Sequence, residues 1–363
     1  MINAYEIRFF QVGSASKGGD AILIRLLDED QKPTIIVVDG GYKETGEKII
    51  TYLKNLNISV IDLVINTHPD IDHISGLIRL FEEQSLTIKK LIMNRPWRDS
   101  NITADYFADS RITDKSVNKR MTEAFKYAYQ LEQVAISKIG ENNIIHPVVG
   151  NNYFGCLTIL SPSKDLYRSK LLESDKTPTT LDDSNNTTTF TRTMNKLVHY
   201  IKGFMSWRNE NTTAINETSI VSLLCMPNKN YLLTADAGKN SIEEALDYKD
   251  SQFSLVHKSI DVLQLPHHGS RKNVTPALIQ RIMAKEYIIS CPPNGLDSHH
   301  PSRRLVNMVL EKVPTAKIFK TADCSSFVFY YNFNWQLPYQ TPMSAFDAVS
   351  YTHLRAHETS AHL

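Results

Sequence analysis

The sequence has few cysteines, and none is placed as a disulfide framework or a cysteine zinc site would require. The four cysteines, Cys156, Cys225, Cys291 and Cys324, are widely spaced and form no C-x-x-C pair. No apolar run approaches the roughly 18 residues needed to span a bilayer. The segment 1–10 also lacks the basic start and long apolar core of a signal peptide. We therefore expect a cytoplasmic protein with no membrane insertion.

The sequence has little net charge as well. A formal charge of +1 at pH 7 gives no overall attraction to nucleic acid or to a membrane surface. Binding to a polyanion would therefore depend on a local basic patch or on a metal site. A hydrophobic content of 42% and a charged content of 22% are ordinary for a globular protein. A chain of 363 residues can form one large α/β domain or two smaller ones.

The densest group of polar side chains is the heptad Thr67-His68-Pro69-Asp70-Ile71-Asp72-His73. The apolar stretch 60–65 before it predicts a buried strand, and the stretch 75–81 after it predicts a helix start. A strand end that opens into a helix is where α/β proteins place ligand-binding groups. Histidine nitrogens and aspartate oxygens are common ligands of zinc and related ions. The heptad therefore predicts a metal site that uses His68, Asp70, Asp72 and His73.

Further polar groups follow three other predicted strands, and we expect distant strand ends to complete the site. Asp236 follows the strand at 231–234, although alone it could instead cap a helix. His267 and His268 follow the strand at 260–265, and the pairing favours a metal-binding or catalytic use. Gly269 would let a ligand approach closely, and Ser270 could donate a hydrogen bond. His300 precedes a proline at a predicted helix start, where it could be a site residue or structural.

The chain is organised as two strand-rich parts around a polar middle segment. We assign 1–335 to one domain with an insertion at about 163–216, which could be a packed decoration or could bind a protein partner. A helix is predicted at 190–207 within it. The tail, 336–363, is predicted to be disordered or non-native, because its end resembles translated adapter sequence, so its three histidines are excluded from the site. Elsewhere, periodicity predicts helices at 43–55 and 117–138 and a strand at 88–93.

Together these motifs resemble the metallo-β-lactamase superfamily, and within it the C-terminal domain of the competence protein ComEC and its stand-alone relatives. The likeness covers about 5–332. Its pieces follow the family's order: Phe9-Phe10-Gln11-Val12-Gly13, Gly19-Asp20-Ala21, Val37-Val38-Asp39-Gly40-Gly41, the heptad, Leu160-Ser161-Pro162, the segment from Asn216 to Val221, Thr234-Ala235-Asp236, Pro266-His267-His268-Gly269-Ser270, His300-Pro301 and Thr321-Ala322-Asp323. The resemblance implies an α/β fold, a four-layer αββα sandwich of two mixed sheets with outer helices.

The resemblance also implies two divalent metal ions. The ligands would come from His68, Asp70, Asp72, His73, Asp236 and one or both of His267 and His268, with Asp236 between the ions. The superfamily's usual motif is H-x-H-x-D-H, and Asp70 replaces its second histidine, as is common in the ComEC-like subgroup. Zn²⁺ is the first expectation, and the added carboxylate makes Mn²⁺ a second. No histidine in 140–181 matches the family's middle motif, since His146 reads as structural. One metal position is therefore expected to be weakly held or filled only with substrate.

The implied function is a hydrolase that uses a metal-activated water, and the subgroup favours a phosphodiesterase or nuclease acting on DNA or RNA. The expected catalytic residues are Asp70, Asp72, His268 and His300. Basic residues could contact phosphate or could be ordinary surface charges: Lys89, Lys90, Arg95, Arg98, Arg271, Lys272, Arg303 and Arg304. Two alternatives remain open: a hydrolase of a small ester, lactone or thioester, and a regulatory or partner-binding subunit with a degenerate site.

Overall fold

The computed structural model describes residues 2–14, 17–107, 109–174, 176–177, 211–253, 259–293, 300–322, 324–333 and 343. The predicted helix at 190–207 lies outside the described residues, as do Asp323, most of the proposed insertion and all of the proposed tail except Met343.

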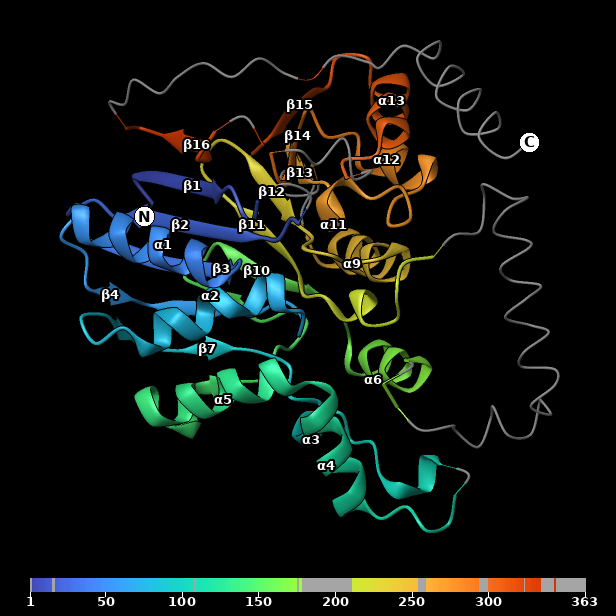
Figure 1. The fold of residues 1–363 in the computed structure, drawn as a ribbon. Helices are drawn as coiled ribbons and strands as arrows, with labels where there is room; N and C mark the ends of the chain where they lie inside the picture. Colours follow the sequence, from blue (N-terminus) through green and yellow to red (C-terminus); the bar gives the residue numbers. More distant parts are fainter. Residues whose placement is uncertain are drawn as a thin grey trace, which may run out of the picture.

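Two seven-stranded mixed sheets pack face to face and form the centre of the fold (Figure 1). The first sheet has the order β16 (Ser326–Tyr331), β1 (Ala4–Phe10), β2 (Ala21–Leu27), β3 (Pro33–Gly40), β5 (Leu63–Ile65), β7 (Leu91–Ile92) and β8 (Ile144–Ile145). The second has the order β15 (Lys317–Lys320), β14 (Glu286–Ile289), β13 (Val262–Gln264), β12 (Asn230–Leu233), β11 (Val221–Cys225), β10 (Leu157–Ser161) and β9 (Asn152–Tyr153). A separate pair joins β4 (Val60–Ile61) to β6 (Thr87–Ile88).

Each sheet is antiparallel in one half and parallel in the other. Strands β3, β5, β7 and β8 run parallel in the first sheet, and strands β12 to β15 run parallel in the second. The carboxyl ends of parallel neighbours meet at one edge of a sheet, which is where α/β folds place their ligand-binding loops. The topology therefore gathers the segments that follow β5, β12, β13 and β14.

Helices lie on the outer face of each sheet (Figure 1), so the predicted four-layer αββα sandwich is confirmed. Helices α1 (Lys43–Asn55), α2 (Ile71–Glu82) and α5 (Lys126–Ile139) cover the first sheet, and α9 (Lys239–Gln252), α12 (Pro276–Ile282) and α13 (Arg303–Lys312) cover the second. The other helices and turns are α3 (Pro96–Asp99), α4 (Asp114–Ala124), α6 (Lys164–Glu173), α11 (Pro266–Gly269) and the 3₁₀ turns Ala104–Tyr106, Glu141–Asn143 and Asn216–Thr218.

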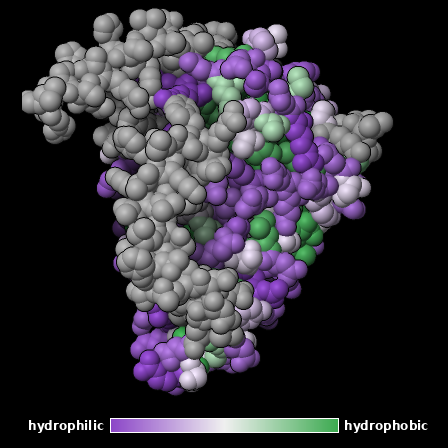
Figure 2. Space-filling model, turned by 90° about the vertical axis from the view of Figure 1, so that its right-hand side faces the viewer, coloured by the Kyte–Doolittle hydropathy of each residue, from purple (hydrophilic) through white to green (hydrophobic). Residues whose placement is uncertain are grey.

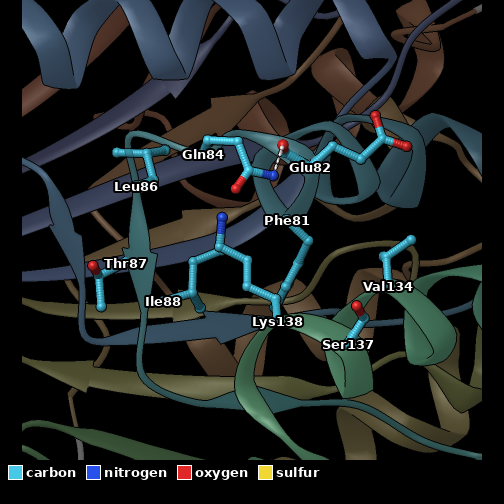
Figure 3. Close-up of a pocket in the computed structure, with 9 residues that line it drawn as sticks. All are labelled: Phe81, Glu82, Gln84, Leu86, Thr87, Ile88, Val134, Ser137 and Lys138. Atoms are coloured by element: carbon cyan, nitrogen blue, oxygen red, sulfur yellow. Dashed lines mark hydrogen bonds between the residues drawn. The ribbon is translucent and has the colours of Figure 1, made fainter.

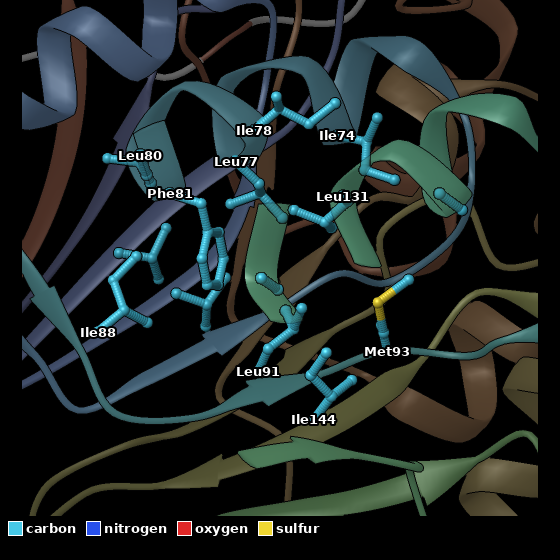
Figure 4. Packing of buried hydrophobic residues seen from close by; sticks show 14 of the residues in the cluster. Ile74, Leu77, Ile78, Leu80, Phe81, Ile88, Leu91, Met93, Leu131 and Ile144 are labelled. Atoms are coloured by element: carbon cyan, nitrogen blue, oxygen red, sulfur yellow. The ribbon is translucent and has the colours of Figure 1, made fainter. Parts of the chain in front are cut away.

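A hydrophobic cluster fills each space between layers, and the cluster beneath α2 holds the start of that helix in place. Ile74, Leu77, Ile78 and Phe81 recur at helical spacing and face inward. They pack against residues of β7, β8 and α5 (Figure 4). Helix α2 also approaches the end of β3 so closely that no side chain fits between them. A Cβ at Gly76 would lie 1.9 Å from the carbonyl oxygen of Gly40. The amino end of α2 is thereby fixed against the end of β3.

Two of the predicted elements are wrong in detail. The helix predicted at 117–138 is interrupted at Phe125, whose φ of −109° and ψ of 41° are not helical. The Phe125 side chain is buried in the cluster under the first sheet, and this packing overrides the local helical pattern. The strand predicted at 88–93 is split between β6 and β7, because the exposed Lys89 and Lys90 separate its apolar ends.

Among the described residues, no helix is both long and apolar enough to cross a bilayer. The described part of the face in Figure 2 is mainly hydrophilic, with hydrophobic side chains in small groups.

Candidate metal centre

The predicted site residues from separate strand ends meet between the two sheets. His68 and the start of α2 follow β5, Asp236 follows β12, and the paired histidines of α11 follow β13. Asp236 does not cap a helix, since Gly238 occupies the N-cap position of α9. The capping alternative for Asp236 therefore does not apply.

One group of ligand atoms surrounds Oδ2 of Asp236. His68 Nε2 and His267 Nε2 each lie 3.7 Å from this oxygen. Oδ2 of Asp70 lies 3.9 Å from His68 Nε2. Atoms that share one ion at about 2.0–2.2 Å lie roughly 3–4 Å from one another. These residues flank a possible metal position, which we call the first position. Asp70 and His267 belong to none of the groups of described residues whose ligand atoms all lie within 4.8 Å of one another, so this position is the more open of the two.

A second group surrounds the other oxygen of the same carboxylate. Oδ1 of Asp236 lies 3.5 Å from His73 Nε2 and 3.8 Å from His268 Nε2. Oδ2 of Asp72 lies 3.7 Å from His268 Nε2 and 4.0 Å from His73 Nε2. Asp72, His73, Asp236 and His268 could hold a second ion, at what we call the second position. Asp236 thus faces both positions, one oxygen to each.

The atoms that face these positions fit a pair of bound cations. His68 Nε2, His73 Nε2, His268 Nε2 and Asp236 Oδ1 are buried, and none has a hydrogen-bond partner among the residues that the structure describes. Burying a polar atom without a partner costs free energy, so nearly all such atoms in proteins are satisfied. The four atoms converge on the two positions, and divalent cations would satisfy all of them.

Asp39 orients the histidines of the heptad. Its Oδ2 accepts a hydrogen bond from Thr67 Oγ1 at 2.5 Å and faces His73 Nδ1 at 2.8 Å. Because the Thr67 hydroxyl proton is used in this way, Thr67 Oγ1 is left to accept from His68 Nδ1 at 3.1 Å. Both rings therefore direct Nδ1 toward these acceptors and Nε2 toward the metal positions.

The paired histidines also have polar contacts at Nδ1. His268 Nδ1 lies 3.0 Å from the carbonyl oxygen of Ser290, which can only accept. His267 Nδ1 lies between a donor and an acceptor, 3.1 Å from Asn216 Nδ2 and 3.3 Å from Asn273 Oδ1, and the Asn273 amide nitrogen donates to the backbone of Asp236. Both histidines adopt left-handed backbone angles, with φ of 50° and 55°. Such conformations cost about 1–2 kcal/mol per residue and cluster at functional sites.

Electrostatics set the protonation of the metal-free centre. Burial by itself lowers the pKa of His268, but Asp236, Asp72 and Asp20 outweigh it and raise that pKa to about 9. Burial and the nearby His268 lower the pKa of His267 to about 4. Burial raises the pKa of Asp236, and His268 and His73 oppose this effect. Burial also lowers the pKa of His73, but Asp236, Asp39 and Asp72 outweigh it and raise that pKa well above its usual value. A cation that enters must therefore displace protons from both His268 and His73.

The remaining predicted residues occupy the rim or lie elsewhere. The His300 ring stacks on that of His267, with centroids 5.4 Å apart and planes inclined by 23°. The Asp70 side chain is 38% exposed, and its Oδ1 lies 3.9 Å from Lys176 Nζ. Ser270 is buried, and its hydroxyl accepts from the Lys272 backbone nitrogen. His146 is not among the clustered ligands, and its Nδ1 lies 3.5 Å from Asp99 Oδ2 instead.

Several of the basic residues considered for phosphate contact form ion pairs instead. Lys89 pairs with Asp62 at 2.6 Å, Arg95 with Asp99 at 2.9 Å, and Arg98 with the buried Glu132 at 3.2 Å. These pairs favour a structural role for the three cations.

Sequence reasoning did not identify Asp20 or Asp39 as site residues. Both appeared only as members of strand-end motifs, and the sequence signal was an aspartate directly before β2 and another at the end of β3. The structure groups Asp39 with His68 and His73, and it groups Asp20 with Asp236 and His268.

A surface pocket lies elsewhere, between the end of α2, β6 and α5 (Figure 3). Its lining includes Phe81, Gln84 and Lys138, but none of the predicted site residues. The Lys138 ammonium donates to the carbonyl oxygen of Glu83. The pocket is therefore separate from the metal centre.

A family model described as the metallo-β-lactamase superfamily matches residues 18–90, which include the heptad. No curated protein matches the chain. Among solved structures, a diphosphatase from the PhnP family is 13% identical, with a TM-score of 0.40, 91% of this chain covered and 99% of that chain. The Rm3 metallo-β-lactamase is 13% identical, with a TM-score of 0.32 and coverage of 73% and 80%. A long-form RNase Z from yeast is 13% identical, with a TM-score of 0.36 and coverage of 78% and 36%.

The similarities to solved structures are too remote to indicate a substrate. The family model and the confirmed fold class agree on a broader assignment, and this assignment implies divalent metal ions. Residues 18–90 are thus similar to the metallo-β-lactamase superfamily, and the αββα arrangement of the two sheets is consistent with the fold of that family.

Proposed function

We propose that this chain is a metal-dependent phosphodiesterase or nuclease of the ComEC-like type, with DNA or RNA as the substrate class. The observation that carries the proposal is the position of Asp236, whose two oxygens face two separate groups of buried ligand atoms. Metal pairs of this kind suit in-line displacement at phosphorus, because they can stabilise both the attacking and the leaving oxygen.

The ligand set suits divalent ions that accept both nitrogen and oxygen ligands. His68, Asp70 and His267 would hold the first ion, and Asp72, His73 and His268 the second, with Asp236 shared. When bound, such ions supply Lewis-acid polarisation of the phosphoryl group and lower the pKa of water to about 7. Carboxylates make up nearly half of the set, which suits Mn²⁺ as well as Zn²⁺.

In this proposal Asp70 acts on the proton of the attacking water. It occupies the N-cap position of α2, yet its side chain accepts no capping hydrogen bond. Its partial exposure puts one oxygen at the mouth of the site, beside Lys176. A carboxylate there can accept the proton as a general base, provided that the water lies within hydrogen-bonding distance.

In this proposal His300 contributes to the rim of the site beside His267. It comes from the segment before α13, and its stacking on His267 brings it close to the first position. A histidine at this place can donate a hydrogen bond to a non-bridging phosphate oxygen or to the leaving oxygen. It would thus contact the substrate without being a metal ligand.

The test compares substrate classes with the same metal-loaded protein. Chain loaded with Mn²⁺ or Zn²⁺ is assayed on single-stranded DNA, RNA and bis-p-nitrophenyl phosphate, and in parallel on a small ester, a lactone and a thioester. We expect cleavage of phosphodiesters, abolished in Asp72→Ala and retained in Asp30→Asn, which changes an exposed carboxylate. A far higher kcat/KM on the ester class would contradict the proposal. A metal content well below one ion per chain would instead indicate a degenerate site.

A further inference from the structure

Asp20 is a buried carboxylate that lies beside the metal centre and has no hydrogen-bond partner among the described residues. Its exposed fraction is 2%. One oxygen of Asp20 forms a compact group with an oxygen of Asp236 and a ring nitrogen of His268, all within 4.8 Å of one another. These are two of the residues that define the second position.

The local backbone fixes Asp20 in this place. Gly19 lies against the heptad so closely that a Cβ there would lie 2.2 Å from the carbonyl oxygen of Asp72. A Cβ at Gly18 would lie 3.2 Å from Cγ of His268. On the other side, β2 begins at Ala21, which pairs with Gly40 in the sheet. Two glycines and a sheet register therefore hold Asp20 against the centre.

A purely structural role does not account for this side chain. A buried carboxylate needs a cation or hydrogen-bond donors, because the loss of hydration is otherwise uncompensated. His73 Nδ1 is 4.0 Å from Asp20 Oδ2, too far for a hydrogen bond, and it hydrogen-bonds to Asp39 Oδ2 at 2.8 Å instead. An ion at the second position would bond directly to a carboxylate that has no hydrogen-bond donor among the described residues.

We propose that Asp20 is an additional ligand of the metal ion at the second position, beside Asp72, His73, Asp236 and His268. The inference rests on the metal centre proposed above and not on the identity of the substrate. A set of three carboxylates and two histidines exceeds the four ligands of a tetrahedral zinc site. It fits the higher coordination number and the oxygen preference of Mn²⁺. Asp20 would therefore bias the second position toward Mn²⁺.

The most direct test is anomalous diffraction from crystals of the whole chain loaded with Mn²⁺. We expect an Asp20 oxygen at a bonding distance of about 2.0–2.6 Å from the ion at the second position. An ion coordinated by Asp72, His73, Asp236 and His268, with both Asp20 oxygens beyond bonding distance, overturns the inference. This readout requires no activity, so it is independent of whether phosphodiesters are the substrate.

Asp20→Asn gives a second test in solution, with the exposed Asp30→Asn as the matched control from the turn after the same strand. Asp20→Asn should weaken Mn²⁺ binding in calorimetry by about 10–100-fold, and Zn²⁺ binding by less. Thermal melting of the metal-free variant and of the metal-free wild type shows that both proteins are folded. Unchanged Mn²⁺ affinity in a folded variant also refutes the inference.

Discussion

Asp39 offers a sharp test of how the protein orients its metal-binding histidines. Both of its oxygens accept hydrogen bonds: Oδ1 from the Thr67 backbone nitrogen at 2.9 Å, and Oδ2 from the Thr67 hydroxyl and the His73 ring. In Asp39→Asn the side chain keeps its shape, but one oxygen becomes an NH₂ group. In either orientation of the amide, its NH₂ group then faces a donor, either the Thr67 backbone N–H or the Thr67 hydroxyl and the His73 ring N–H. We therefore predict that this substitution weakens metal binding although Asp39 itself contacts no ion.

The magnitude follows from the lost hydrogen bond. A hydrogen bond to a charged group contributes about 1.5–3 kcal/mol. If that free energy is lost from metal binding, the affinity falls roughly 10- to 150-fold. The stability of the metal-free protein should change less, because burial raises the pKa of Asp39 and so opposes its charged form, while His73 and Thr67 favour it. Loss of the carboxylate therefore also relieves a desolvation penalty.

Competition with a chelator of known affinity measures the effect, and urea denaturation of the metal-free protein separates it from loss of folding. Asp30→Asn serves as the control, since Asp30 is exposed in the turn after β2. Metal affinity within about threefold of wild type in a folded Asp39→Asn protein would refute the orienting role.

Three further predictions address the ligands, the protons and the core. Asp236→Ala should reduce the metal content from two ions per chain to at most one and abolish hydrolysis; two retained ions by elemental analysis would contradict the shared carboxylate. Because the pKa of His268 is raised to about 9 without metal, its proton must leave on binding. The pKa of His73 is raised as well, so apparent metal affinity should rise with pH to at least about 9, and calorimetry in buffers of different ionisation enthalpy should detect proton release. A pH-independent affinity would count against this. Leu77→Ala, at a fully buried position on the inner face of α2, should lower the free energy of unfolding in urea by about 2–5 kcal/mol. A loss below about 1 kcal/mol would show that α2 is not fixed by this packing.

The sequence predicted the fold class and most of the clustered residues because their signals are local. Strand ends are short apolar runs that stop at polar residues, and the heptad, Asp236 and the paired histidines each follow such a run. Helix α1 lies where its periodicity placed it. Tertiary packing decided where some helices end. At Phe125, burial of the ring ends a helix that the local pattern would continue.

The partners of the predicted ligands were not predictable in the same way. Asp39 is 28 residues from Thr67 and 34 from His73, and only the register of β3 beside β5 brings them together. Asp20 lacks any local signal beyond a preceding pair of glycines. The choice between His267 and His268 also depended on the fold, because both rings face Asp236, one beside each of its oxygens.

The measurement that tests the central claim most directly is the metal stoichiometry of the full chain, purified without chelator and titrated with Mn²⁺ and Zn²⁺. Elemental analysis of wild type should give two ions per chain, falling to at most one in Asp236→Ala. Fewer than one ion per chain in wild type, under conditions where the protein is folded, would contradict a metal centre built around Asp236.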